Sequence, residues 1–226
     1  MAREMNAGVP GGVEPRGRTS MEVAAGGSML EAVAGVAAIV LGVLGLVHLV
    51  PDVLAAVAVI VVGAALMSQG TSMASRFTAQ YQQSGETRTV STNFSGGLML
   101  EFLGGLAGII LGILALITVK PPTLESIAVI AFGGVLLLSA GLVSRINMLQ
   151  ADAMMDEPAR VLMRDSAATT SLIVVGTAVA LIVLGILALM GVHTLPFILI
   201  SMIVIGSAIV ITGTAVSGAM LSMIRR

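Results

Sequence analysis

The chain has 226 residues, of which 57% are hydrophobic and 10% are charged, and its formal net charge is -1. About a quarter of the residues of a soluble domain are charged, so this composition excludes a protein that faces water on all sides. The small net charge argues against a nucleic-acid partner, and the absence of cysteine excludes disulfides and thiolate metal sites.

The first 28 residues differ from the rest of the chain. They are rich in glycine and of mixed charge, and they lack the apolar core of a cleavable signal before Met29. We therefore predict a cytoplasmic tail over residues 1–28, flexible or bound to a partner, that becomes helical near Ser20.

Six apolar segments follow, each close to the ~20 residues that a helix needs to cross a bilayer. We place them at roughly 29–49, 53–75, 98–118, 124–145, 169–191 and 196–221. Tight turns containing proline follow the first, third and fifth segments, so consecutive segments pair as antiparallel helices. The predicted units are the hairpins 29–75, 98–145 and 169–226, the last with the C-terminal tail.

Two longer polar stretches separate the hairpins, at 76–97 and 146–168. The first is rich in Gln, Ser and Thr, and the second mixes charged and apolar residues. We interpret both as cytoplasmic links and predict a short amphipathic helix or docking site over 148–163.

An internal repeat relates the three hairpins. The sequence LGVLGL at 41–46 returns as LGILAL at 111–116 and at 184–189, and Gly63 recurs in the same register as Gly133 and Gly206. The predicted fold class is therefore all-α. It is an integral membrane six-helix bundle built from three repeated transmembrane helical hairpins with pseudo-threefold symmetry, unlike the inverted repeats of many transporters.

Glycines mark the helix faces that we expect to meet inside this bundle. Gly104, Gly108 and Gly112 recur at every fourth position, which predicts a stripe on one face where another backbone comes close. The full set of predicted helix-packing glycines is Gly35, Gly42, Gly63, Gly104, Gly108, Gly112, Gly133, Gly185 and Gly206.

The basic residues predict the orientation of the chain. Ten of the eleven Lys and Arg residues lie in the N-terminal tail, the two links and the C-terminal end, and only Lys120 lies in a hairpin turn. Since Lys and Arg mark the cytoplasmic side, we expect a multi-pass protein of the inner (cytoplasmic) membrane with both termini in the cytoplasm.

Two carboxylates lie within the predicted membrane spans, where a charge is costly and needs a reason. Glu101 shares a helix face with Gly105, Gly108 and Gly112, and Glu31 has the same register in the first hairpin. Both acids should therefore point toward neighbouring helices, near the cytoplasmic edge of the bilayer.

Arg76 and Arg145 end the second arms of the same two hairpins at about the level of these acids. In the third hairpin Val174 and Gly218 replace the acid and the base together, as expected if acid and base pair. The first hypothesis is an ion pair that fixes the helix ends. The second is a proton- or cation-binding site, formed by the two acids, that opens to the cytoplasm.

His48 and His193 are the only histidines, and each lies near the outer turn of its hairpin. They could sense pH, because histidine titrates near neutrality, or they could simply be turn residues. No metal-ligand constellation and no catalytic motif accompany them, so we predict neither an enzyme nor a cofactor.

The glycine-rich first arm, the proline turn and the second arm with spaced glycines resemble the HdeD-like membrane proteins. The residues that carry the resemblance are Gly108 to Leu116, Pro121, Gly133, Leu184 to Leu189, Pro196, Gly206 and Gly213. This bacterial family has six spans in three hairpins, and its founding member is linked to acid resistance.

The resemblance implies a non-enzymatic inner-membrane protein that acts in envelope stress. A structural subunit of a membrane assembly is equally compatible, because glycine faces left over after hairpin packing suit lateral association. The expected partners are the lipid bilayer and either other membrane protein chains or further copies of this chain. The competing hypothesis is a small channel or a proton- or cation-coupled carrier that uses Glu31 and Glu101.

Overall fold

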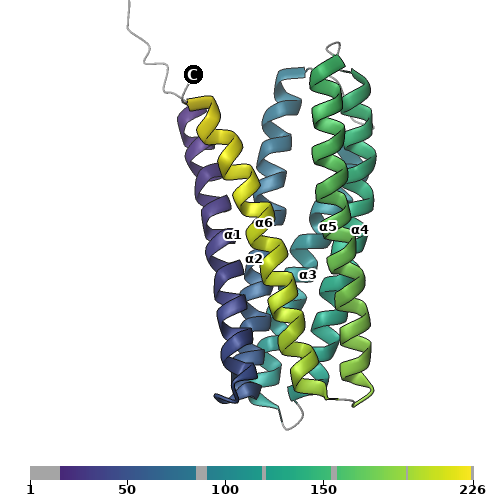
Figure 1. The fold of residues 1–226 in the computed structure, drawn as a ribbon. Coiled ribbons are helices and arrows are strands. Elements are labelled where there is room, and N and C mark those ends of the chain that lie inside the picture. The colour runs from purple at the N-terminus through teal and green to yellow at the C-terminus, as the bar shows by residue number, and fades with distance from the viewer. Residues whose placement is uncertain (1–15, 85–90, 119–120, 154–156, 192, 225–226) are drawn as a thin grey trace, which may run out of the picture.

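The computed structural model describes the backbone of residues 16–84, 91–118, 121–153, 157–191 and 193–224 (Figure 1). Side chains are described over 30–70, 100–118, 122–141, 171–191 and 193–212. These residues form six helices: α1 (Arg16–Leu46), α2 (Pro51–Ser84), α3 (Ser91–Ile117), α4 (Pro121–Ala153), α5 (Glu157–Leu189) and α6 (Thr194–Ile224).

Consecutive helices form hairpins, and the tight turns have a local cause. Pro51 and Pro121 are the first residues of α2 and α4, a position where the fixed φ of proline suits a helix and its missing N–H is not needed. The turns that end α1 and α5 contain left-handed residues, among them Gly191 with φ 83°. These turns lie together at one end of the molecule, which we call the turn end (Figure 1). The opposite end, where α1 begins and α6 ends, is the terminal end.

The helices continue well into the polar stretches that we expected to be links. α2 extends to Ser84 and α3 begins at Ser91, while α4 extends to Ala153 and α5 begins at Glu157. The short amphipathic helix expected over 148–163 is therefore divided between the ends of α4 and α5. Adding a residue to an existing helix costs little free energy, because each added residue gains a hydrogen bond. The long apolar helices therefore continue into the polar sequences next to them.

Five helices contain a segment long and apolar enough to cross a membrane, from 18 residues in α3 to 20 in α2 and α4. The apolar segment of α1, Leu30–Leu46, is shorter. Large apolar side chains are exposed along the outer faces of α1, α3 and α5, for example Val33, Val36 and Val40 on α1. The chain is a multi-pass helical membrane protein, and these faces contact lipid.

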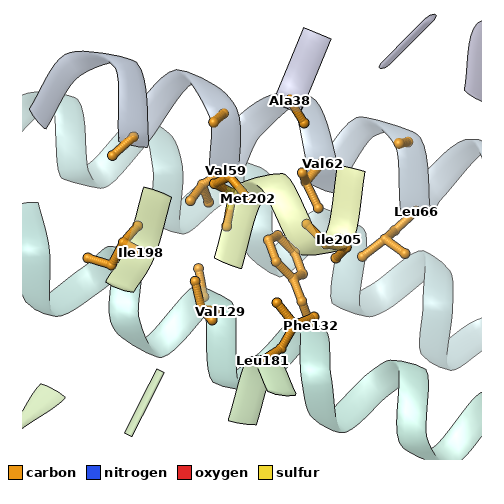
Figure 2. Close-up of a cluster of buried hydrophobic side chains, with 14 of the residues drawn as sticks. Ala38, Val59, Val62, Leu66, Val129, Phe132, Leu181, Ile198, Met202 and Ile205 are labelled. Carbon is orange, nitrogen blue, oxygen red and sulfur yellow. The ribbon is translucent and has the colours of Figure 1, made fainter. Parts of the chain in front are cut away.

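Each helix packs against its neighbours in the chain, and α1 also packs against α6. The second helices of the hairpins, α2, α4 and α6, contact one another as well. Their inner faces form the core, where Val59, Val129, Phe132, Met202 and Ile205 have no exposed surface. Figure 2 shows the ring of Phe132 directed from α4 toward Ile205 of α6.

Candidate functional site

The buried acids of the described residues lie on either side of the apolar core. Glu31 and Glu101 lie near the middle of α1 and α3, on the side of the apolar core that faces the terminal end, and they are 9% and 7% exposed. Glu125 lies one turn into α4, close to the turn end, and has no exposed surface. The apolar core described above separates the two groups along the bundle.

Glu31 connects three helices through its side chain. The amide of Gln69 on α2 donates a hydrogen bond to Glu31 Oε1. The hydroxyl of Thr212 on α6 lies 3.3 Å from the same oxygen, although it also reaches the carbonyl oxygens of Ala208 and Ile209 in its own helix. The carboxyl group of Glu31 therefore joins the hairpin partner α2 to the last helix of the chain.

Glu101 occupies a similar place on α3. Its carboxyl group lies close to the Ser139 hydroxyl on α4, which donates to the carbonyl oxygen of Leu136 in its own helix at 3.2 Å, and close enough to Glu31 for the two acids to interact electrostatically. Its Oε2 atom is buried without a hydrogen-bond partner among the described residues. We call Glu31, Gln69, Glu101, Ser139 and Thr212 the terminal-end cluster.

The predicted pairing of these acids with Arg76 and Arg145 concerns side chains outside the described part of the molecule. The two arginines lie within α2 and α4, one to two turns beyond Gln69 and Ser139. The neutral partners Gln69, Ser139 and Thr212 did not figure in our sequence prediction. These three residues recur in the second arms in the same register as Gly63, Gly133 and Gly206, and this recurrence was the signal in the sequence that could have identified them.

The predicted helix-packing glycines are all buried, and each lies where a side chain would collide with a neighbouring helix. A Cβ atom on Gly63 would lie 2.6 Å from the carbonyl oxygen of Gly105, and one on Gly35 would lie 2.8 Å from that of Gly206. At Gly133 the nearest atom would be the carbonyl oxygen of Ala178, also at 2.8 Å. Backbones of adjacent hairpins therefore come into close approach at these positions.

At the other glycines of the set the nearest atom to an added Cβ would belong to a side chain, with backbone atoms of the same neighbour close behind at Gly42, Gly112 and Gly185. Gly42, Gly112 and Gly185 face isoleucines at equivalent positions of α6, α2 and α4: Ile203, Ile60 and Ile130. Gly104 faces Val135, and Gly108 faces the ring of Phe132.

The expected single stripe of Gly104, Gly108 and Gly112 is in fact divided between two neighbours. Gly104 and Gly108 face α4, whereas Gly112 faces α2. An α-helix has 3.6 residues per turn, so positions spaced by four drift around the helix and reach a second partner. Gly105, which was not in the predicted set, makes the backbone contact with Gly63.

His48 and His193 are exposed and lie in different turns at the turn end. Both have left-handed backbone conformations, with φ values of 67° and 45°. This geometry makes them turn residues. Whether they also sense pH stays a prediction.

Glu125 was missed by the sequence interpretation. An acid in the first turns of a helix, three residues after Pro122, is typical of a solvated helix start. The overlooked signal is its register: Glu125 shares a helix face with Val129, Phe132 and Leu136, all of them buried.

The chain matches no protein-family model, no curated protein and no solved structure. What the helices establish is a multi-pass helical membrane protein with sequential hairpins, glycine-mediated helix contacts and buried acids at both ends of its core.

Proposed function

We propose that the chain is a non-enzymatic, six-span protein of the inner membrane that serves as a structural subunit of a membrane assembly or acts in envelope stress, as its similarity to the HdeD-like proteins suggests. The observation that carries the proposal is the filled centre of the bundle. Val59, Val129, Phe132, Met202 and Ile205 close the space between α2, α4 and α6 without exposed surface. A protein with a packed apolar centre and an apolar exterior suits lateral association more than conduction.

The proposal includes a threefold repeat of the hairpin. The pairs Gly35–Gly206, Gly105–Gly63 and Ala178–Gly133 support it, because their members recur at common sequence offsets and each pair joins a first arm to the second arm of another hairpin. Three equivalent contacts of this kind link the hairpins in a closed cycle, since α1 packs against α6.

The partner in this proposal is another membrane protein chain or a second copy of this one. Gly134 and Gly141 on α4 and Gly176 on α5 have open space where a side chain would stand. These small residues differ from the packing glycines because no described residue lies where their side chain would be. They leave room for a helix of another chain to come close.

Co-purification in mild detergent followed by native mass spectrometry tests the subunit role. We expect a stoichiometric partner or a homo-oligomer that Gly134→Leu disrupts. The matched control is Ala64→Leu, at an exposed small residue on α2, which should leave the association intact. A wild-type chain that stays monomeric and partner-free in native lipid nanodiscs would contradict the subunit role.

A second candidate function, a proton- or cation-coupled carrier, is favoured by the terminal-end cluster. Two carboxyl groups from α1 and α3 interact there among three neutral hydrogen-bonding side chains. Flux into proteoliposomes should then fall in Glu31→Gln and Glu101→Gln while thermal stability is retained. A purely structural cluster would give the reverse result, with altered stability and no flux in the wild type.

A further inference from the structure

Glu125 stands where the core otherwise has apolar side chains. The inner face of α4 contains Glu125, Val129, Phe132 and Leu136, at spacings of four, three and four residues. The inner faces of α2 and α6 have the same spacing and begin with residues of comparable burial, Ala55 and Ile198. The carboxyl group thus occupies the outermost layer of the core, at the turn end.

Both carboxyl oxygens of Glu125 are buried, and neither has a hydrogen-bond partner in the described structure. An isolated carboxylate in apolar surroundings is strongly destabilised, so a buried one normally has a bound positive charge or hydrogen-bond donors. Glu31 satisfies this rule through Gln69, whereas Glu125 does not.

The charged surroundings of Glu125 can be given for each helix that packs against α4. On α2, Asp52 is exposed and close enough to interact electrostatically with Glu125, with the same sign of charge. The described side chains of α5 and α6 include no acid or base, apart from His193 just before α6. On α3 the described acid is Glu101, which lies well away from the turn end of that helix. Lys120 precedes α4 and lies outside the described residues.

We propose that Glu125 binds a single positive charge, a proton or a monovalent metal ion, which enters from the turn end past Asp52. The exposed carboxylate of Asp52 attracts cations to this end, and the buried carboxyl group of Glu125 accepts one. Val129 and Phe132 close the core directly behind the site, so it communicates with one side of the membrane only. This inference goes beyond the proposed function and does not depend on the terminal-end cluster.

The test uses the full-length protein in nanodiscs and infrared difference spectroscopy, which detects the carbonyl-stretch band of a protonated carboxyl group. If the occupant is a proton, a band appears on acidification, disappears in Glu125→Gln and persists in the matched control Glu101→Gln. If the occupant is a metal ion, the band grows when NaCl or KCl is replaced by choline chloride at constant pH and ionic strength.

Asp52→Asn provides a variant that changes an exposed side chain and should fold. Removing its negative charge should move the midpoint of the Glu125 band to lower pH, or raise the concentration of Na⁺ or K⁺ needed to suppress the band. The proposal is overturned if no band assigned to Glu125 responds to pH or to either cation. It is equally overturned if the native chain shows no cation response and Lys120→Gln creates one. That result would mean that the ammonium group of Lys120 neutralises Glu125 in the native chain.

Discussion

At the scale of single residues, Glu31 has the best-defined interactions of the buried acids. Its Oε1 atom accepts a hydrogen bond from the amide of Gln69 on α2, and truncating Glu31 removes that acceptor. We expect Glu31→Ala to destabilise the protein by about 1–3 kcal/mol, the usual cost of leaving a buried polar group unsatisfied. Glu31→Gln keeps an acceptor oxygen and should lose less. Thermal unfolding followed by circular dichroism measures both, since the chain has no tryptophan.

The contrast between the two variants tests the hydrogen bond rather than the charge. Equal destabilisation by Glu31→Ala and Glu31→Gln would mean that the negative charge matters, as in the predicted pairing with Arg76. No loss in either variant would mean that Gln69 finds another acceptor.

Phe132 packs against Gly108, and the space for its ring exists because Gly108 has no side chain. The Phe132 ring is fully buried and lies over Gly108, so that a methyl group there would collide with the ring. We expect Phe132→Ala to lower the free energy of unfolding by about 3–5 kcal/mol through the cavity that it leaves. Gly108→Ala should be destabilising alone and better tolerated with Phe132→Leu, because the smaller side chain frees space for the methyl group.

A double-mutant cycle on these two positions, measured in a single detergent, decides the point. Additive effects would show that the ring and the glycine are independent, contrary to the contact in the structure.

The sequence predicted the environment of a single residue correctly where only one pattern applied to it. The prediction failed where two patterns pointed to different environments. Glu31 and Glu101 could be predicted to face other helices, because they share the register of the glycines. Glu125 could not, since its place after Pro122 predicted a solvated helix start while its register with Val129 and Phe132 predicted burial. The partners of the acids were also not predictable, because hydrogen bonds depend on which helices become neighbours.

At the scale of helices, the contact between α2 and α3 depends on two facing glycines. A Cβ on Gly63 would lie 2.6 Å from the carbonyl oxygen of Gly105, and one on Gly105 would lie 2.5 Å from that of Gly63. Backbone atoms cannot move aside as a side chain can, so Gly63→Ala should force the helices apart and cost about 1–3 kcal/mol. Gly134→Ala is the control, because open space surrounds that position.

Thermal unfolding of the two alanine variants checks this prediction. Gly134→Ala should be neutral or slightly stabilising, since alanine is the better helix former. If both variants behave alike, helix propensity and not helix contact governs these glycines.

Helix lengths and helix neighbours differ in how far the sequence predicts them. Short turns such as the one before Pro51 allow only antiparallel neighbours, so the hairpins were predictable. The contacts between hairpins were not, because Gly104, Gly108 and Gly112 have the same spacing whether they meet one helix or two. The polar ends of α2 and α4 were underestimated, since hydropathy marks where a membrane span ends and not where a helix ends.

At the scale of the whole molecule, the number of membrane crossings decides the topology. The apolar segment of α1, Leu30–Leu46, is shorter than those of the other five helices. It nevertheless packs against α2 and α6 in the same bundle, and ten of the eleven Lys and Arg residues lie outside the hairpin turns in the sequence. We therefore expect six crossings with both termini in the cytoplasm, because basic segments stay on that side.

Because the chain lacks cysteine, single introduced cysteines report this topology directly. A membrane-impermeant maleimide applied to right-side-out vesicles should modify His48→Cys and His193→Cys, whose side chains are exposed at the turn end. Ala2→Cys and Ser222→Cys should react only in inside-out vesicles or after permeabilisation. If Ala2→Cys and Ser222→Cys react from opposite sides, the chain crosses the bilayer an odd number of times. The short apolar segment of α1 would then lie along the membrane surface instead of spanning it.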